Sequence, residues 1–290
     1  INGSVRGRDV FVIPAHAVGR HAEGRKLDIN GAIMEHLIMI ETARRASAAR
    51  VTAIAPFFGY ARQDRKKTGR EPISAKLLAN LFAALGADQI ISVDLHSPQI
   101  TGFFDPVFDN LTAMRALRKE VKGLIPKKQK KDWVMVAPDL GRAQVAGRWA
   151  DKLGIGLAII DKERNAKGEV TTRGKAVFPE LEGRQCVVVD DMVDTAGTLL
   201  NGLDTINRSR AARIVVAATH PPFSGNAIQR INDSPIDTVV VTNTVPVAKA
   251  KKQLGERLQV VDIGPILGSA IGRIVTKGSL SEMFKGEDRS

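Results

Sequence analysis

Residues 187–199 read Val187-Val188-Val189-Asp190-Asp191-Met192-Val193-Asp194-Thr195-Ala196-Gly197-Thr198-Leu199. The apolar run at the start predicts a buried strand, and the small residues after it predict a tight loop that opens a helix. Backbone N–H groups of such a loop and its threonine hydroxyls can surround a phosphate, which the helix dipole also favours. The two adjacent acids at the end of the strand can accept hydrogen bonds from sugar hydroxyls or hold Mg²⁺.

A simpler interpretation is that Asp190 and Asp191 only cap the helix. Adjacent carboxylates after a fully apolar strand repel each other, however, unless a cation or a sugar relieves the repulsion. We therefore favour a binding site for a phosphorylated sugar, because this motif is far more specific than a lone glycine fingerprint.

Composition narrows the classes of function. The chain has 290 residues, a formal charge of +12 and 43% hydrophobic residues, enough to bury one large core or two medium ones. The charge favours an anionic partner, but no basic segment carries the interleaved aromatic residues that stack nucleic-acid bases, which disfavours nucleic acid. The sequence has neither a membrane-spanning run nor a signal peptide, so we expect a cytoplasmic protein. Its only cysteine, Cys186, is read as a small buried hydrophobe.

Apolar strands alternate with amphipathic helical stretches along the chain, which is typical of parallel α/β sheets covered on both faces. The Lys-rich run 127–131 is read as a solvated loop between two similar α/β series. The stretch 161–182 has no clear periodicity, which is typical of a lid, a binding loop or a disordered segment. The predicted strands are 10–13, 51–55, 90–93, 134–137, 157–160, 186–189 and 214–218, and the predicted helices are 32–48, 72–85, 144–153 and 198–206.

Segment 187–199 resembles the signature of the type I phosphoribosyltransferase superfamily. Further segments closely resemble the ribose-phosphate diphosphokinase family, and the resemblance runs from Val5 to Phe284. These segments are Phe58 to Lys66, Arg70 to Lys76, Val93 to His96, Gly102 to Asp105, Asp161 to Arg164 and Ala218 to His220. The resemblance implies transfer of the β,γ-diphosphate of ATP to the 1-hydroxyl of ribose 5-phosphate, giving phosphoribosyl diphosphate and AMP for nucleotide biosynthesis.

The resemblance also implies roles for individual residues. Lys162 and Arg164 match the catalytic Lys-x-Arg of the family, and no Walker-type phosphate loop is present, so ATP would bind elsewhere. His96 would contact the metal or its nucleotide, and Asp139 of the Pro138-Asp139 pair would hold Mg²⁺ directly or through water. ATP would bind at Arg62, Gln63, Asp64 and His96, and ribose 5-phosphate at Asp190, Asp191, Asp194, Thr195, Ala196, Gly197 and Thr198.

Weaker expectations concern metal ligands and regulation. Asp94, Asp105 and Asp109 are secondary metal candidates, while His16, His21, His36 and His220 receive no role. Arg70, Ser279 and Ser281 resemble positions where phosphate and nucleoside-diphosphate effectors bind in the family, or they simply flank a capped terminal helix.

The resemblance implies two tandem phosphoribosyltransferase-like domains, each a mainly parallel sheet flanked by helices. We expect an N-terminal domain over 1–112, a C-terminal domain over 113–275 with the ribose-phosphate site, and a segment 276–290 that packs back on the first. The family forms homo-oligomers, as hexamers, and contacts adenine from a neighbouring subunit through a Phe-x-Asp-Gly-Glu stretch that would precede Ile1. The alternative is a catalytically silent regulatory relative, or a nucleic-acid binder that senses phosphoribosyl diphosphate.

Overall fold

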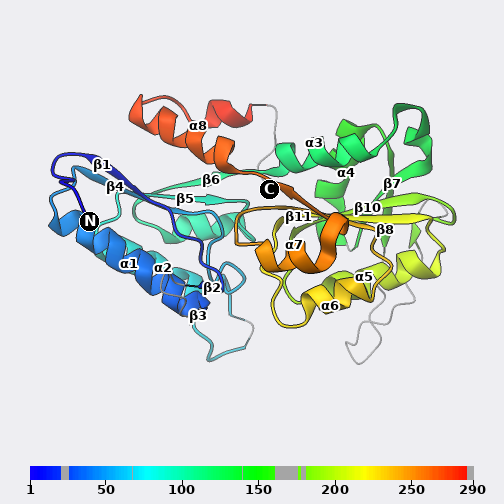
Figure 1. Ribbon diagram of the computed structural model, residues 1–290, viewed down its shortest axis with the longest axis horizontal. Coiled ribbons are helices and arrows are strands. Elements are labelled where there is room, and N and C mark those ends of the chain that lie inside the picture. Colours follow the sequence, from blue (N-terminus) through cyan, green and yellow to red (C-terminus); the bar gives the residue numbers. More distant parts are fainter. Residues whose placement is uncertain (21–25, 67, 139, 161–175, 178–180, 286–290) are drawn as a thin grey trace. The chain divides into compact units, whose positions relative to one another are not determined.

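The computed structural model describes residues 1–20, 26–66, 68–138, 140–160, 176–177 and 181–285 (Figure 1). They form two compact units, which are described separately. The first consists of Ile1–Ala113, Thr244–Pro246 and Ile263–Ser290, and the second of Met114–Asn243 and Val247–Asp262.

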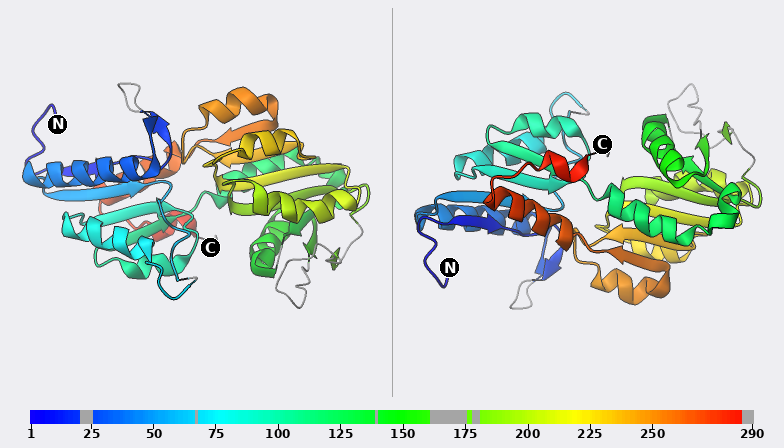
Figure 2. Two further views of the ribbon diagram at one scale, coloured as in Figure 1. Left: turned by 90° about the horizontal axis from the view of Figure 1, so that it is seen from below. Right: turned by 90° about the horizontal axis from the view of Figure 1, so that it is seen from above.

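The first unit is built on a parallel sheet with strand order β1-β4-β5-β6. Helices α1 and α2 cover one face and α8 covers the other, so the strands are apolar on both sides (Figures 1 and 2). A two-stranded ribbon of β2 (Gly19–Arg20) and β3 (Lys26–Leu27) precedes α1. The elements are β1 (Asp9–Val12), α1 (Ile29–Arg45), β4 (Arg50–Ala55), α2 (Ser74–Ala84), β5 (Gln89–Val93), β6 (Val107–Leu111) and α8 (Gly264–Val275), with short 3₁₀ turns η1 (Pro98–Phe103) and η5 (Ser281–Phe284).

Alternate side chains of the β4 and β5 strands supply two separate cores, one on each face of this sheet. Ala53 and Ile90 pack with Leu37 of α1 and Phe82 of α2. On the opposite face, Ile54 and Ile91 pack with Ala270 and Ile274 of α8 and with Phe284. The period of two along each strand therefore determines which helix each residue meets.

The second unit contains a larger sheet with strand order β13-β12-β11-β10-β7-β8-β9, parallel except for β9, which is antiparallel to β8. Helices α3 and α4 cover one face, and α5, α6 and α7 cover the other (Figure 2). The strands are β7 (Trp133–Ala137), β8 (Gly156–Ile160), β9 (Ala176–Val177), β10 (Gln185–Met192), β11 (Arg213–His220), β12 (Thr238–Thr242) and β13 (Leu258–Val261). The helices are α3 (Met114–Leu124), α4 (Ala143–Leu153), α5 (Gly197–Arg208), α6 (Ala227–Asn232) and α7 (Ala248–Leu254), with 3₁₀ turns η2 (Lys127–Asp132), η3 (Leu140–Arg142) and η4 (Gly255–Arg257).

The predicted α/β class is confirmed, since both sheets are mainly parallel and flanked by helices. Two local predictions differ from the structure. Strand β10 continues through Asp190 and Asp191 to Met192, where the sequence predicted an end at Val189, because this end of the strand keeps pairing with β11, Asp190 with Ala218 and Met192 with His220. The Lys-rich run predicted as a loop forms the 3₁₀ turn η2, with the Gln129 amide donating to the Pro126 carbonyl at 2.9 Å.

Helix α8 belongs to the first unit, whereas the predicted limits 113–275 grouped it with the second domain. The reason is its apolar face, which packs on Ile54, Ile91 and Val93 of the first sheet. The sequence contains no signal for this return of the chain, because any buried sheet face can accept an apolar helix.

Candidate active site

Two adjacent acids lie at the carboxyl end of β10, in the centre of the second unit's sheet. Strand β10 pairs with β7, so the turn after β7 leaves the same edge of the sheet. This turn, η3, carries Arg142, whose guanidinium contacts Asp190 at 2.7 Å and also pairs with Asp191. The side chains of Asp190 and Asp191 are only 20% and 8% exposed, so the cation offsets part of the cost of burying two carboxylates.

The ionisation of Asp190 reflects this environment. The pKa of Asp190 is raised to about 7, mainly by burial; the positive charge of Arg142 acts in the opposite direction, and the charge of Asp191 adds to the increase. The Asp190 carboxyl group therefore takes up a proton more readily than an exposed aspartate does. A ligand that donates hydroxyl hydrogen bonds would favour the ionised form and would bind better as the pH rises. Sequence reasoning missed Arg142, although its place three residues after Asp139 of the Pro138-Asp139 pair is a signal that could have indicated it.

The loop after β10 is held from the neighbouring strand. The amide of Val193 donates to the His220 carbonyl at 2.8 Å, and the amides of Phe223 and Ser224 donate to the carbonyls of Val193 and Asp194 at 3.1 and 3.0 Å. The chain beyond β11 therefore fixes the path of this loop. The loop is thus ordered by contacts that are distant in the sequence.

The loop then turns sharply into α5. Ala196 has a left-handed backbone with φ of 59° and its side chain is buried, whereas Thr195 is exposed. Helix α5 begins at Gly197, so the first amides of the helix point toward the end of the loop, an arrangement suited to a phosphate. Arg230 of α6 donates to the Thr195 carbonyl at 3.1 Å and adds positive charge beside the helix start. The side chain of Thr198 lies outside the described residues.

The first unit brings a second group of predicted residues to one sheet edge. Strands β4 and β5 are adjacent and parallel, so the segments after them leave from the same edge. The segment after β4 carries Arg62 and Gln63, both exposed, and Asp64, which is partly buried. The segment after β5 carries His96, which is exposed.

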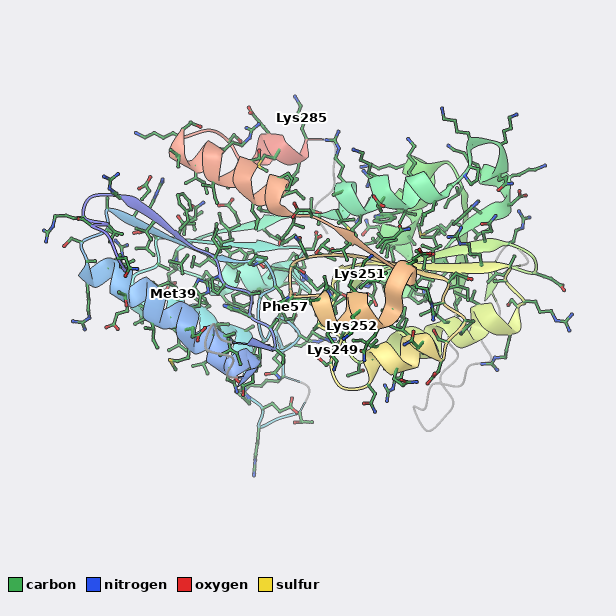
Figure 3. The ribbon with its side chains drawn as sticks, viewed as in Figure 1. Met39, Phe57, Lys249, Lys251, Lys252 and Lys285 are labelled. Atoms are coloured by element: carbon green, nitrogen blue, oxygen red, sulfur yellow. The ribbon has the colours of Figure 1, made fainter. Side chains whose placement is uncertain are left out.

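Backbone hydrogen bonds shape the segment after β4. Tyr60 has a left-handed backbone with φ of 61°, and the Gln63 amide donates to its carbonyl at 2.8 Å. The Ala75 amide at the start of α2 donates to the Gln63 carbonyl at 3.3 Å. Phe57, labelled in Figure 3, precedes this turn and is buried. Arg62 and Gln63 therefore project from a turn whose backbone is fixed on both sides.

Comparisons with known proteins identify the family. The family model described as the N-terminal domain of ribose phosphate pyrophosphokinase matches residues 1–86, and the phosphoribosyl synthetase-associated domain matches 171–285. A ribose-phosphate pyrophosphokinase of Streptomyces coelicolor is 41% identical over 281 residues, covering 97% of this chain and 82% of the relative. One from Mycobacterium leprae is 40% identical over 285 residues, covering 98% of this chain and 83% of the relative. This chain belongs to the ribose-phosphate pyrophosphokinase family.

A solved structure supports the same assignment. The crystal structure of phosphoribosylpyrophosphate synthetase from Mycobacterium smegmatis is similar, with a TM-score of 0.81 and 40% identity, and the match covers 96% of this chain and 86% of that one. The predicted family and the predicted pair of phosphoribosyltransferase-like α/β folds are thereby confirmed. The chain is related to enzymes of diphosphate transfer over nearly its whole length.

The roles of individual residues stay predictions. The structure places Asp190, Asp191, Asp194 and the backbone of 195–198 together at one end of β10. It places Arg62, Gln63, Asp64 and His96 in the first unit. Three predicted residues, Lys162, Arg164 and Asp139, lie outside the described residues.

Two of the secondary metal candidates have structural partners. Asp94, which is buried, accepts from the Ala113 amide at 2.9 Å, and Asp109 accepts from the Gln89 side chain at 2.7 Å. The Asp109 contact joins β6 to β5, and the Asp94 contact joins the segments that follow these two strands. Within the described part of the chain, no group of three or more His, Cys, Asp or Glu side chains could hold a metal ion.

The predicted effector residues Arg70, Ser279 and Ser281 are exposed and belong to the first unit. The Ser279 carbonyl accepts from Arg273 at 2.8 Å, and the same guanidinium contacts Glu282 at 3.1 Å. Cys186 is buried, and burial raises the pKa of its thiol to about 12, in keeping with the prediction of a small hydrophobic residue. No described helix combines the length and the apolar character that a membrane crossing requires.

Proposed function

We propose that the protein is an ATP-dependent ribose-phosphate diphosphokinase that transfers the β,γ-diphosphate of ATP to the 1-hydroxyl of ribose 5-phosphate. The products are phosphoribosyl diphosphate and AMP. The observation that carries this proposal is the pair of acids at the end of β10, followed by a left-handed turn into the start of α5. Membership of the ribose-phosphate pyrophosphokinase family supports it.

Ribose 5-phosphate would bind along the end of β10. Asp190 and Asp191 would accept hydrogen bonds from ribose hydroxyls in place of part of their pairing with Arg142. The amides at the start of α5 and the hydroxyls of Thr195 and Thr198 would hold the 5-phosphate. Asp194, Ala196 and Gly197 complete this loop, and Ala196 provides its left-handed turn.

ATP would bind through the segment after β4 and through His96. Arg62 would pair with phosphate oxygens, and Gln63 and Asp64 would hydrogen-bond the nucleotide. The ribose 1-hydroxyl attacks the β-phosphorus, the bond from that phosphorus to the α-phosphate oxygen breaks, and AMP leaves with this oxygen. Lys162 and Arg164 would stabilise negative charge on the transferring phosphates, so positioning and charge dominate the catalysis.

Mg²⁺ is the metal that we propose for this reaction. The donors suit it, because Mg²⁺ prefers oxygen ligands and is commonly held by one or two carboxylates together with substrate phosphates. Asp139 would supply a carboxylate, and His96 would contact the phosphate or a metal-bound water. When bound, the ion would neutralise phosphate charge and orient the diphosphate group.

A homo-oligomer is the expected assembly, with a hexamer as the specific proposal. The outer surfaces of α1 and α2 expose large apolar side chains, including Met34, Ile38 and Leu77, which are 56%, 54% and 58% exposed. Met39, labelled in Figure 3, adds to this surface on α1. Such a surface on one helical layer is typical of a contact with another protein, here a second copy. We propose a cytoplasmic location, where ATP and ribose 5-phosphate are formed.

The decisive experiment is incubation of the protein with ATP, Mg²⁺ and ribose 5-phosphate, with separation of AMP and phosphoribosyl diphosphate by chromatography. We expect both products in equal amounts, and none when ribose 5-phosphate is omitted. Asp191→Asn is the matched variant, for which we expect a raised KM for ribose 5-phosphate. Release of ADP or inorganic phosphate without phosphoribosyl diphosphate would contradict the proposal, and no turnover at all would favour the silent relative.

A further inference from the structure

Two buried histidines of the first unit lie beside the turn that follows β4. His16, in the segment after β1, and His36, on α1, are both fully shielded from solvent. Nε2 of His16 lies 2.9 Å from Nδ1 of His36, and Nδ1 of His16 accepts a hydrogen bond from the Gly59 amide at 3.1 Å. A chain of polar contacts therefore runs from α1 to this turn through the core.

The donor at one end of this chain determines where each proton lies. The Gly59 amide can only donate, so Nδ1 of His16 carries no proton and the ring proton of neutral His16 is on Nε2. Nε2 of His16 then donates to Nδ1 of His36, which places the His36 proton on its buried Nε2, an atom for which the structure shows no hydrogen-bond partner. Burial lowers the pKa of His16 to about 3 and that of His36 to about 2, so both rings are neutral.

Aromatic packing leaves the two rings little freedom to move. His36 meets the edge of Phe82 with ring centroids 5.0 Å apart, and His16 lies 5.9 Å from Phe58 and 6.1 Å from Phe82. A Cβ at Gly59 would lie 2.9 Å from Cδ1 of Ile33 on α1 and 3.3 Å from Cβ of His16, so the turn packs closely against both. The imidazole of His16 thus holds the turn at a fixed distance from α1.

The held turn leads directly into the segment assigned to ATP. Gly59 is followed by Tyr60, whose left-handed backbone reverses the chain, and the Gln63 amide closes on its carbonyl. Only two residues separate Gly59 from Arg62. Because Arg62 and Gln63 are exposed and project from this turn, a shift of its backbone would move both side chains.

We propose that His16, oriented by His36, is a positioning residue for ATP that aligns the turn carrying Arg62 and Gln63. The proposal rests on the function proposed above, since it takes this segment as the nucleotide site. Neither imidazole touches the nucleotide in this arrangement; the pair acts through the Gly59 amide. The substrate affected is ATP and not ribose 5-phosphate, whose proposed residues belong to the second unit.

The test compares two substitutions at each histidine. His16→Asn keeps an acceptor at the position of Nδ1, whereas His16→Leu has a similar volume and no acceptor, leaving the Gly59 amide buried and without a partner. His36→Asn and His36→Leu make the same comparison one step further along the chain. Each purified variant is measured for equilibrium binding of ATP without the second substrate, and for the KM of each substrate.

We expect His16→Leu to weaken ATP binding about tenfold, the effect of one lost buried hydrogen bond, with the KM for ribose 5-phosphate changed less than about twofold. His16→Asn should remain within about threefold of the unsubstituted protein, and the His36 pair should follow the same order with smaller effects. Unchanged ATP affinity in a folded His16→Leu variant, equal effects on both substrates, or no rescue by asparagine would overturn the proposal.

A measurement on the unsubstituted protein separates this proposal from the proposed function. Nitrogen NMR of the histidine rings should show both neutral, each with its proton on Nε2, and the Gly59 amide should exchange slowly with solvent. A proton on Nδ1 of His16 would contradict the proposal, because that nitrogen could then not accept from the Gly59 amide. If no phosphoribosyl diphosphate is formed, the proposed function fails. The ring tautomers and the ATP affinities of the variants still test whether His16 positions the turn. If His16→Leu does not fold, the proposal is tested by three other measurements: the ring tautomers, the His36→Asn and His36→Leu variants, and the ATP affinity of His16→Asn.

Discussion

Arg142 is the residue that most directly controls the charge of the candidate ribose site. Its guanidinium contacts Asp190 at 2.7 Å and pairs with Asp191, so it partly compensates two carboxylates that burial would otherwise drive toward protonation. The pKa of Asp190 is raised to about 7 even with this cation present. Changes at Arg142 should therefore alter how ligand binding depends on pH.

Arg142→Ala should shift the acid limb of kcat/KM for ribose 5-phosphate to higher pH, by about one pH unit or more. Removing the cation raises the pKa of Asp190 further, so a higher pH is needed to ionise the carboxylate that accepts the ribose hydroxyls. Initial rates across pH 5.5–9 would measure the shift. Arg142→Lys keeps the charge and should shift the limb less; coincident profiles for all three proteins would contradict this role.

The two basic residues of the predicted catalytic loop, Lys162 and Arg164, are expected to act mainly on the rate of the chemical step. Lys162→Ala and Arg164→Ala should each lower kcat about a hundredfold while changing KM little, because contacts made mainly in the transition state contribute roughly 3 kcal/mol. Lys167→Ala removes the same charge from the same stretch of sequence and serves as the control. Full kcat with a raised KM for ATP would show that the residue binds substrate and transition state equally.

At the scale of elements, the junction between α1 and the turn after β4 has almost no spare volume. A Cβ at Gly59 would lie 2.9 Å from Cδ1 of Ile33, a buried side chain of α1, and 3.3 Å from Cβ of His16. Contacts this short require a neighbour to move. The close approach, and not a left-handed backbone, explains the glycine.

Gly59→Ala should lower the free energy of unfolding by about 1–3 kcal/mol, the usual cost of overpacking a core. Ile33→Val removes the Cδ1 atom that clashes, so the double variant should be less destabilised than the sum of the two single variants. Urea unfolding of the three proteins would measure this coupling. Strict additivity would show that Ile33 is not the limiting contact.

The buried histidine pair also affects the response of the fold to acid. The pKa values of His16 and His36 are lowered to about 3 and about 2 in the folded state, from an ordinary value of 6.5. The unfolded chain therefore takes up protons below pH 6.5 that the folded chain does not. The stability from these neutral rings is complete above pH 6.5 and is lost progressively as the pH falls toward their folded pKa values.

At pH 5.5 each histidine should cost about 1.4 kcal/mol of stability relative to pH 7.5, or roughly 3 kcal/mol for the pair. The difference between urea unfolding free energies at these two pH values gives the measurement. The His16→Asn, His36→Asn double variant retains all other titrating groups and should lose less stability on acidification. An equal loss in both proteins would mean that the pair does not stay neutral in the fold.

At the scale of the whole molecule, the exposed apolar surface of α1 and α2 is the feature that a single chain does not explain. Met34, Ile38 and Leu77 are more than half exposed, although the same helices bury their opposite sides against the first sheet. Association with a second copy would remove this surface from water.

Light scattering should therefore give a mass well above the 31.3 kDa of one chain. Ile38→Glu and Leu77→Glu should lower that mass, because charges in an apolar contact are costly to bury. Val107→Glu changes a similarly exposed apolar residue of the first unit, at 63% exposure, and should leave the mass unchanged. A monomeric mass for the unsubstituted protein would contradict the proposed assembly. A lower mass for Val107→Glu alone would indicate that the contact lies at β6 and not at α1 and α2.

Local sequence patterns determined much of the fold and of the candidate site. Buried parallel strands are continuous apolar runs and amphipathic helices repeat at 3.6 residues, so the core of every predicted strand and helix agrees with the structure to within a few residues. The acids and small residues of 190–197 follow one another along the chain, so their joint role could be predicted as a motif. Only the tertiary structure decided which distant residues meet them.

Arg142 reaches Asp191 across 49 positions, and His16 meets Gly59 across 43, because parallel strands bring separate loops to one edge. The packing of α8 on the first sheet is likewise a contact between segments far apart in the sequence. Such contacts depend on topology and packing, for which one amino-acid sequence carries no local pattern.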